Sequence, residues 1–292
     1  MKTLDLTVLF YEGPTGRAYL EMLRRNGFQV KKIIHMVPRP GGISKLLPKG
    51  VRANMSAARQ DQLANHWPRA LAKHYPGLVG DITEKLEAAF DLGDGFFEAL
   101  RAGPDLSPYS DNIEMLEIEN FKDPAFLEAL KAEPESLILF SGGGILPPAA
   151  FDIPQIRFLH IHPGYLPHVR GADGLLWSSL VRGRPGVSAF IMQPGLDVGD
   201  LVAALETEPL RFMAAETEVP DNQALYRMVF SYYDPILRAV ALRSVLDKLE
   251  NAAALAGAPQ DMTEGVTYYF MAPLTRATAL KRLFDLPGSA VF

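Results

Sequence analysis

The order of apolar and polar positions predicts a βαβ unit at the start of the chain. Residues 6–37 read as an apolar strand, a glycine turn, an amphipathic helix and a second apolar strand. The helical pattern stops at Asn26-Gly27, a pair typical of a helix C-terminus. A helical crossover of this kind favours parallel pairing of the two strands that it joins.

The middle of the chain interrupts this alternation and then resumes it. After the loop-forming residues Pro38 to Gly42, two stretches with helical periodicity, at about 52–74 and 80–102, predict a helical insertion within about 40–108. Beyond it the strand and helix patterns alternate again. Strands are predicted at 112–121, 136–140, 156–162 and 186–193, and helices at 123–133 and near 174–182.

This alternation predicts an α/β fold with a Rossmann-like, mostly parallel sheet in residues 1–207. In open parallel sheets ligands bind at the carboxyl ends of the strands, and we expect the loops after residues 140, 162 and 193 to lie there. Residues 208–292 predict a smaller, helix-rich C-terminal segment. It contains a long helix at about 218–250 with a break at Pro235, a short strand at 266–271 and a final helix at 274–284. The long helix is a candidate for a homodimer interface.

Composition excludes several kinds of chemistry. The 292 residues contain no cysteine, which excludes disulfides, a thiolate nucleophile and Cys-ligated metals. A net charge of −5, with no clustered Lys/Arg surface, argues against a nucleic-acid partner. No apolar run approaches the length of a membrane span, and Asp5 interrupts the only early apolar run. We therefore expect a cytoplasmic protein without a membrane partner that acts on a small molecule.

Two histidines end the strand predicted at 156–162. Because side chains alternate along a strand, His160 and His162 point to the same face. Taken alone, a single histidine is more often a hydrogen-bonded structural residue than a catalytic one. The turn that follows, Pro163 to Pro167, exposes the end of the strand and favours a functional role for His162.

Neighbouring loops supply the other candidates. Asp197 lies between Gly195 and Gly199, where it suits ordinary turn chemistry or the partner of an imidazole. The run Gly142–Gly144 permits a flat ligand to approach the backbone. It lacks the lysine of a phosphate loop and the spacing of a dinucleotide fingerprint, which argues against ATP and NAD. Arg170 reads equally as a solvated loop charge, a clamp for an anionic substrate or a brace for its loop.

Residues 160–202 resemble the formyltransferase family, which includes methionyl-tRNA, glycinamide-ribonucleotide and sugar-nucleotide N-formyltransferases. The family pattern runs Asn-x-His, a Leu-Pro turn, Arg-Gly in several branches, a helix, a Gly-Val strand and an Asp-x-Gly loop, and this chain has a similar order and spacing. The correspondence is good over about 110–205 and looser back to residue 1. Gly-Tyr-Leu-Pro followed by Arg-Gly is most similar to the sugar N-formyltransferases.

The resemblance implies a role for each matching residue. His162 matches the family's catalytic histidine, Asp197 matches its catalytic aspartate, and His160 stands where the family has an asparagine. Tyr165 and Arg170 are the candidates for contacting the substrate. The loops that match those holding the pterin ring of 10-formyltetrahydrofolate supply Ser141, Gly142, Gly143, Gly144, Ile145, Leu146, Gln193, Gly195, Leu196 and Gly199.

The implied reaction is transfer of a formyl group from 10-formyltetrahydrofolate to a small-molecule primary amine, such as an amino sugar nucleotide, without a metal. His162 and His160 would stabilise the tetrahedral oxyanion, and Asp197 would orient His162 and help to move the proton. Three alternatives stay open: a formyltetrahydrofolate hydrolase, a metal-dependent hydrolase with His160 and His162 as ligands and His168 as a candidate third ligand, and a non-catalytic binder of folate or nucleotides. Formylation of transfer RNA is disfavoured, because residues 208–292 lack the basic character expected of a nucleic-acid-binding domain.

Overall fold

A seven-stranded sheet forms the centre of the protein. The structure is a computed structural model, and it describes residues 1–39, 47–101 and 103–286. The strands are β1 (Lys2–Phe10), β2 (Phe28–Pro38), β3 (Ile113–Ile118), β4 (Ser136–Phe140), β5 (Ile156–His162), β7 (Gly186–Met192) and β8 (Gly199–Glu206). Their order is β3-β2-β1-β4-β5-β7-β8, and the first five are parallel. The predicted α/β fold with a mostly parallel sheet is confirmed.

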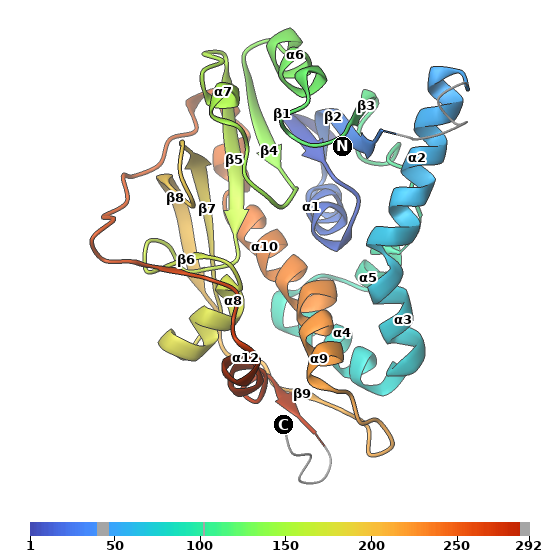
Figure 1. Ribbon diagram of the computed structural model, residues 1–292, viewed down its shortest axis with the longest axis vertical. Coiled ribbons are helices and arrows are strands. Elements are labelled where there is room, and N and C mark those ends of the chain that lie inside the picture. Colours follow the sequence, from blue (N-terminus) through green and yellow to red (C-terminus); the bar gives the residue numbers. More distant parts are fainter. Residues whose placement is uncertain (40–46, 102, 287–292) are drawn as a thin grey trace.

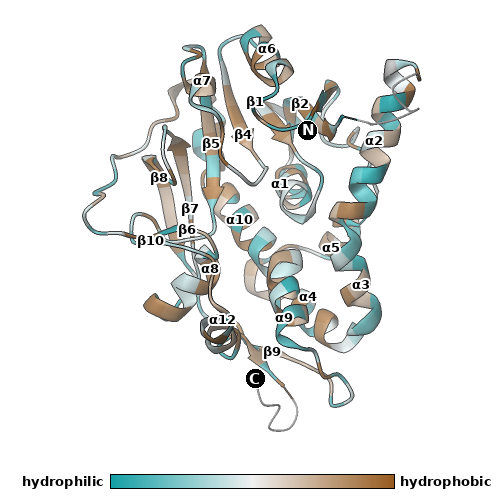
Figure 2. Ribbon diagram, in the orientation of Figure 1, coloured by the Kyte–Doolittle hydropathy of each residue, from teal (hydrophilic) through white to brown (hydrophobic). Residues whose placement is uncertain are grey.

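Helices cover both faces of the sheet (Figure 1). On one face α1 (Pro14–Arg25) and α10 (Asp234–Arg243) lie side by side and share a core with Leu159. On the other face α6 (Pro124–Ala132) and α7 (Pro148–Phe151) pack in a second core that contains Phe158. Successive residues of β5 thus enter opposite cores, as the alternation of a strand buried on both faces requires. Figure 2 shows the same segregation, with largely hydrophobic strands and a largely hydrophilic α3 (His66–His74).

Local sequence signals start several of these helices. α1, α6, α10 and α12 (Pro273–Leu280) each have a proline in the first turn, where the missing N–H has no helical partner to lose. The side chain of Asp123 caps α6 by accepting a hydrogen bond from the backbone N–H of Ala125 at 3.1 Å. The predicted βαβ opening and the helix at 123–133 are confirmed.

The insertion is helical, but its helices are divided differently from the prediction. Between β2 and β3 the described residues form α2 (Lys49–Ala64), α3, α4 (Pro76–Phe90) and α5 (Phe96–Leu100). The predicted helix at 52–74 is wrong in being continuous: Pro68, in the first turn of α3, has no N–H to continue α2. The predicted helix at 80–102 is interrupted at 91–95, where Asp91 has a left-handed φ of 47°. Residues 40–46 and 102 of the predicted insertion lie outside the described residues.

The direction of β7 also departs from the prediction. β7 pairs antiparallel with both β5 and β8, with His162 opposite Ser188. The expectation that the loop after residue 193 follows the carboxyl end of a parallel strand is therefore wrong. The crossover between β5 and β7 holds only β6 (Val169–Gly171), α8 (Gly174–Trp177) and a π-helical turn at Ser178–Arg182, and it returns the chain in the opposite direction.

Residues 208–292 share the core of the sheet domain. The predicted long helix consists of α9 (Asn222–Met228), a π-helical turn at Val229–Tyr233, α10 and α11 (Leu246–Leu249), with Pro235 in the first turn of α10. Two small parallel pairs join this segment to earlier residues: β10 (Val266–Tyr268) with β6, and β11 (Phe284–Asp285) with β9 (Phe212–Met213). Among the described residues, no helix combines the length and apolar character needed to span a bilayer.

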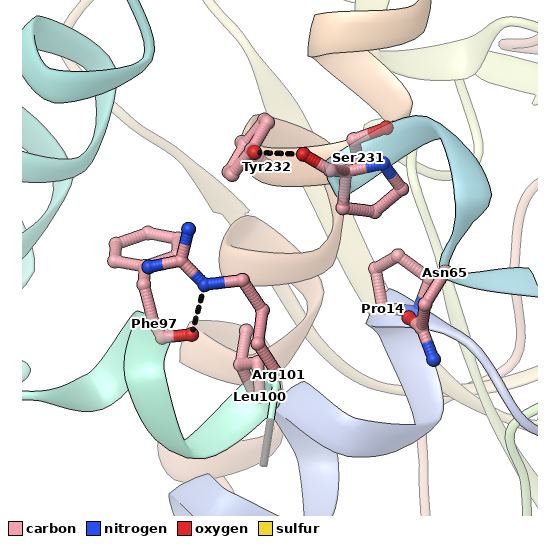
Figure 3. A pocket seen from close by; sticks show the side chains of 8 residues that line it. Pro14, Asn65, Phe97, Leu100, Arg101, Ser231 and Tyr232 are labelled. Atoms are coloured by element: carbon pink, nitrogen blue, oxygen red, sulfur yellow. Dashed lines mark hydrogen bonds between the residues drawn. The ribbon is translucent and has the colours of Figure 1, made fainter. Parts of the chain in front are cut away.

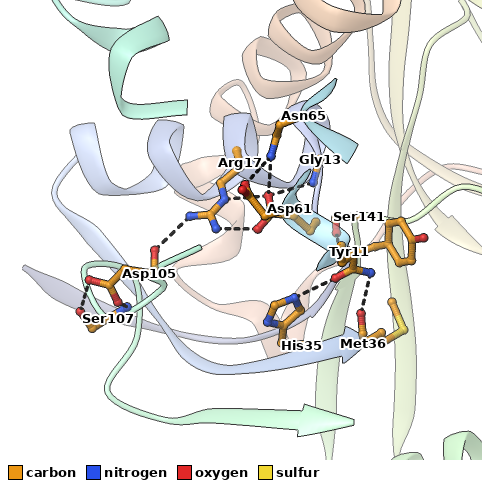
Figure 4. A network of polar contacts seen from close by, with 12 residues as sticks. Tyr11, Gly13, Arg17, His35, Met36, Asp61, Asn65, Asp105, Ser107 and Ser141 are labelled. Atoms are coloured by element: carbon orange, nitrogen blue, oxygen red, sulfur yellow. Dashed lines mark hydrogen bonds and ion pairs between the residues drawn. The ribbon is translucent and has the colours of Figure 1, made fainter. Parts of the chain in front are cut away.

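A buried ion pair fastens α1 to the end of β1 (Figure 4). Arg17 donates from Nε and Nη2 to the two carboxylate oxygens of Glu12, at 2.9 and 2.6 Å. Its Nη1 donates to the carbonyl of Asp105 at 3.0 Å, which ties the loop before β3 to the same group. Both side chains are buried, so neither charge has water to replace a lost partner.

We predict that Arg17→Met lowers the free energy of unfolding by about 3–5 kcal/mol, because it leaves the Glu12 carboxylate buried without its partner. Urea unfolding measures the difference. Lys131→Met is the matched control, since Lys131 and Glu128 form an exposed pair whose loss should not change stability measurably. Equal stability of the two variants would contradict the prediction.

Candidate active site

His162 and Asp197 meet at the end of β5. Nδ1 of His162 lies 3.3 Å from Oδ1 of Asp197, and the two side chains are 3% and 10% exposed. Nε2 of the same ring lies 3.0 Å from the carbonyl oxygen of Val169 in β6. The structure therefore brings together the imidazole and the carboxylate that the sequence analysis paired.

The turn after β5 fixes the His162 ring. The chain reverses after Pro163-Gly164, and Val169 returns against Nε2. A side chain at Gly164 would place its Cβ 2.5 Å from Nε2 of His162 and 2.6 Å from the carbonyl of Val169. Only glycine lets the turn close this tightly on the ring.

Asp197 comes from the tip of the β7–β8 hairpin. Its backbone has a φ of 54°, in the left-handed region that disfavours residues with a Cβ. Its Oδ2 accepts a hydrogen bond from the backbone N–H of Gly171 at 2.7 Å, and its Oδ1 faces His162. The carboxylate is thus held between β6 and the end of β5.

Burial lowers the pKa of His162, and attraction to the Asp197 carboxylate partly opposes this effect. A neutral imidazole carries one N–H, but this ring faces two acceptors, the Val169 carbonyl and the Asp197 carboxylate. If Nε2–H donates to Val169, Nδ1 presents a lone pair toward Asp197. A proton taken up at Nδ1 then gains a direct electrostatic partner.

His160 differs from His162 in its hydrogen bonds and in its pKa. Its Nδ1–H donates to the carbonyl of Phe140 at 3.1 Å. Burial, followed by repulsion from Arg238, lowers the pKa of His160 to about 4, so the ring is neutral near pH 7. Nε2 then carries a lone pair and makes no hydrogen bond within the part of the chain that the structure describes. This tautomer accepts a hydrogen bond from a ligand, and it does not favour the expected role of His160 as a donor to an oxyanion.

A cavity of about 130 Å³ adjoins the His162–Asp197 pair. Two loops form its walls, one after β4 and one at the tip of the β7–β8 hairpin. Ile145 and Leu196 stand at its rim with 75% and 45% of their surfaces exposed. The lining residues are Gly144, Ile145, Leu146, Pro148, Phe151, His160, Met192, Pro194, Gly195, Leu196 and Asp197.

The cavity contains half of the residues predicted to hold a pterin ring. Gly144, Ile145, Leu146, Gly195 and Leu196 line it, whereas Ser141, Gly142, Gly143, Gln193 and Gly199 are not among its lining residues. The Ser141 hydroxyl donates to the carbonyl of Leu9 at 2.9 Å and accepts from the N–H of Tyr11 at 3.1 Å. Ser141 therefore joins the ends of β4 and β1 rather than facing the cavity.

Tyr165 and Arg170, the predicted substrate contacts, are engaged by their own chain. The guanidinium of Arg182 lies 4.5 Å from the centre of the Tyr165 ring, and the His168 ring stacks parallel to it. Arg170 is buried and donates to the carbonyl of Gly265 at 3.1 Å. Neither lines the cavity, so their substrate role stays a prediction; for Arg170 the contacts fit a brace for its loop.

The structure gives little support for the metal-binding alternative. Nδ1 of His168 bonds the carbonyl of Glu264 at 3.1 Å, apart from the His160 and His162 rings. No group of three or more metal-ligating side chains occurs among residues 1–39, 47–101 and 103–286.

Two other cavities in the described part of the chain contain no imidazole paired with a carboxylate. One, of about 10 Å³, lies where α1, α3 and α5 meet, and Figure 3 shows two hydrogen bonds of its lining residues, from Tyr232 to the carbonyl of Pro68 and from Arg101 to the carbonyl of Phe97. The other, of about 400 Å³, is lined by α2, β3 and the loop before β3. His35, which lines it, already bonds Gln60 at 3.0 Å.

Sequence reasoning missed Arg238, which lies directly behind the two histidines. Its Nη1 donates at 3.0 Å to the carbonyl of Ile161, between His160 and His162. Its Nε donates at 2.8 Å to Asp234, which is buried. Arg238 belongs to α10, where an arginine among apolar residues reads as part of an ordinary amphipathic helix, so no local signal pointed to it.

These features define a class: an α/β protein with a buried imidazole–carboxylate pair beside a cavity at a strand end. Residues 87–221 match the sequence model of the family described as formyl transferase. The match covers just under half of the chain, and it is to the family that the motif resemblance indicated.

Its relatives cover part of the chain. A methionyl-tRNA formyltransferase of Syntrophus aciditrophicus is 40% identical over 98 residues, which are 32% of this chain and 31% of that protein. One of Thermus thermophilus is 32% identical over 154 residues, which are 52% of this chain and 46% of that protein. The matched region thus spans less than half the length of either relative. Among solved structures, a 4-N formyltransferase from Francisella tularensis aligns over 96% of this chain and 87% of that one, at 12% identity and a TM-score of 0.46.

We predict that acid weakens the fold through His160. Its pKa falls from an ordinary 6.5 to about 4 on folding, so between these values the unfolded chain binds more protons than the folded one. Stability should therefore drop as the pH falls through this window, by at most about 1.4 kcal/mol per pH unit. Urea unfolding across the window should show a shallower drop for His160→Asn than for the wild type or for His74→Asn, at an exposed histidine. Equal slopes for all three would contradict the assignment.

Proposed function

We propose that the protein transfers a formyl group from 10-formyltetrahydrofolate to the primary amine of a small molecule. The observation that carries the proposal is the 3.3 Å contact between His162 and Asp197 beside the cavity that holds His160. Formation of an amide from an amine requires that a proton leave the attacking nitrogen and another reach the leaving group. A buried imidazole–carboxylate pair suits both transfers.

The cavity fits the head group of a folate. Gly144 and Gly195 have φ values of 107° and 130°, and without side chains they expose backbone N–H and C=O groups to a bound ring. Ile145 and Leu196 offer apolar surface, which suits the faces of a flat heterocycle. These residues, with Leu146, would hold the pterin ring, and 10-formyltetrahydrofolate when bound supplies the formyl carbon that the amine attacks.

The two histidines have different roles toward the amine: His160 orients it and His162 accepts its proton. Nε2 of His160, with its lone pair free, accepts a hydrogen bond from the amine and orients it. Asp197 lines the cavity, so it passes the proton that the amine loses to Nδ1 of His162, and it then stabilises the imidazolium that results. The same proton is then available to the nitrogen that departs, so that no covalent link between enzyme and formyl group is needed.

Charge favours a small amine over a transfer RNA. Residues 208–292 contain eight Lys and Arg against ten Asp and Glu. A surface that neutralises nucleic-acid phosphates needs the opposite balance. We therefore propose an amino sugar nucleotide or a similar small amine as the acceptor.

The test is to incubate the purified protein with 10-formyltetrahydrofolate and one acceptor at a time: amino sugar nucleotides, amino acid derivatives, methionyl-tRNA, or no amine. The expected result is tetrahydrofolate release coupled to formylation of a small amine, detected by mass spectrometry. Equal release without any amine would indicate a hydrolase. Formylation of methionyl-tRNA alone would overturn the proposed acceptor class, and binding without turnover across the panel would indicate a non-catalytic binder.

We predict that His162→Asn lowers kcat/KM at least about a hundredfold, the size of effect expected when one transition-state contact is lost. Tetrahydrofolate affinity, measured by calorimetry, should stay close to that of the wild type, because His162 does not line the cavity. His74→Asn serves as the control with unchanged kinetics. Near-normal turnover of His162→Asn on a proven acceptor would remove His162 from the proposed role.

A further inference from the structure

A segment near residue 260 pairs with two elements that hold Asp197 in place, the β7–β8 hairpin and β6. We call residues 256–271 the return segment. Ala258 exchanges two backbone hydrogen bonds with Leu201 at the start of β8, at 2.7 and 2.9 Å. Farther on, β10 pairs with β6, the strand whose Gly171 N–H holds the Asp197 carboxylate. The return segment thus links the hairpin that carries Asp197 to the strand that its carboxylate contacts.

One side chain of the return segment reaches the backbone of Asp197 itself. Nε2 of Gln260 donates to the carbonyl of Gly199 at 2.7 Å and to the carbonyl of Asp197 at 3.3 Å. An amide NH₂ has two hydrogens, so a single nitrogen serves both carbonyls. Gly171 holds the carboxylate from one side while Gln260 holds the peptide from the other.

The conformation of Asp197 explains why it needs this support. Its left-handed φ of 54° costs on the order of 1 kcal/mol and persists only where the surroundings hold it. Gly195 and Gly199, on either side, both have positive φ values, so the hairpin tip has little stiffness of its own. Without an external tie, the carboxylate has other orientations available.

We propose that Gln260 is a positioning residue that keeps the Asp197 carboxylate against His162 by holding the two carbonyls at the tip of the β7–β8 hairpin. The return segment is a rigid anchor for it. A Cβ at Gly265 would lie 1.8 Å from the carbonyl oxygen of Pro167, and one at Gly171 would lie 2.1 Å from that of Tyr268. The segment therefore packs directly on the turn that follows His162. The proposal depends on the proposed function only where it treats His162 and Asp197 as the proton-transfer pair.

The test compares Gln260→Met with the wild type, since methionine keeps the length of the side chain and removes both donors without adding charge. We expect the titration midpoint of the His162 ring, followed by NMR, to move down in Gln260→Met in the same direction as in Asp197→Asn, because attraction to the carboxylate raises it. On a proven acceptor, kcat should fall about ten- to a hundredfold, as expected for a small misplacement of a reacting group, with little change in KM for 10-formyltetrahydrofolate.

Two controls separate positioning from general damage to the fold. Gln155→Met removes a comparable amide, whose Nε2 bonds the carbonyls of Lys131 and Glu133 far from the site, and should leave His162 unchanged. In an Asp197→Asn background, adding Gln260→Met should cause no further shift of His162. An unchanged midpoint in Gln260→Met, or an equal shift in both backgrounds, would overturn the proposal. A wild-type protein that transfers no formyl group would overturn the proposed function and leave these titrations meaningful.

Discussion

The site depends on the position of the Asp197 carboxylate at the end of β5. Asp197 belongs to the β7–β8 hairpin, and β7 runs antiparallel to β5. β7 leaves the edge where β5 ends, so Asp197 at the far turn reaches His162 only because the hairpin tip folds back. The glycines around Asp197, its left-handed backbone and the N–H of Gly171 all serve this return. In a parallel arrangement the carboxylate would have stood at the strand end without such devices.

Charged side chains near the contact between His162 and Asp197 have opposing effects on the pKa values of the two histidines. Arg238 lies against the carbonyl between the two histidines and disfavours a proton on either ring. Asp197 and, more weakly, Asp234 favour a proton on His162. His160 has less compensation, and its pKa falls to about 4. Adjacent residues of one strand face thus acquire different acid–base properties, one ring suited to accepting a hydrogen bond and the other to holding a proton.

Much of the fold was predictable from local pattern. The βαβ opening, the strand that carries His160 and His162, and the glycine loop after β4 follow from periodicity and turn chemistry over a few residues. The pairing of His162 with Asp197 was predictable from the motif resemblance, and the structure places the two 3.3 Å apart.

The rest depends on contacts between distant residues, which leave no local trace. The antiparallel direction of β7 depends on its pairing with β5 and β8, and the break at Asn65 depends on a proline three residues later. From the sequence, Arg170 fitted a clamp for an anionic substrate and a brace for its loop equally well. The partners that favour the brace lie in the return segment, far along the chain. Gln260 and Arg238 touch the site through backbone carbonyls, which any residue possesses, so no pattern of residue types could identify them.

The pairing of β10 with β6 has a consequence for biosynthesis. A ribosome makes the chain from its N-terminus, so the sheet and both histidines emerge well before residues 266–268. Until those residues dock, β6, whose Gly171 N–H holds the Asp197 carboxylate, lacks its neighbouring strand, and the contact between His162 and Asp197 lacks one of its supports. The imidazole–carboxylate pair is therefore completed only after most of the residues that form the hydrophobic core have been synthesised.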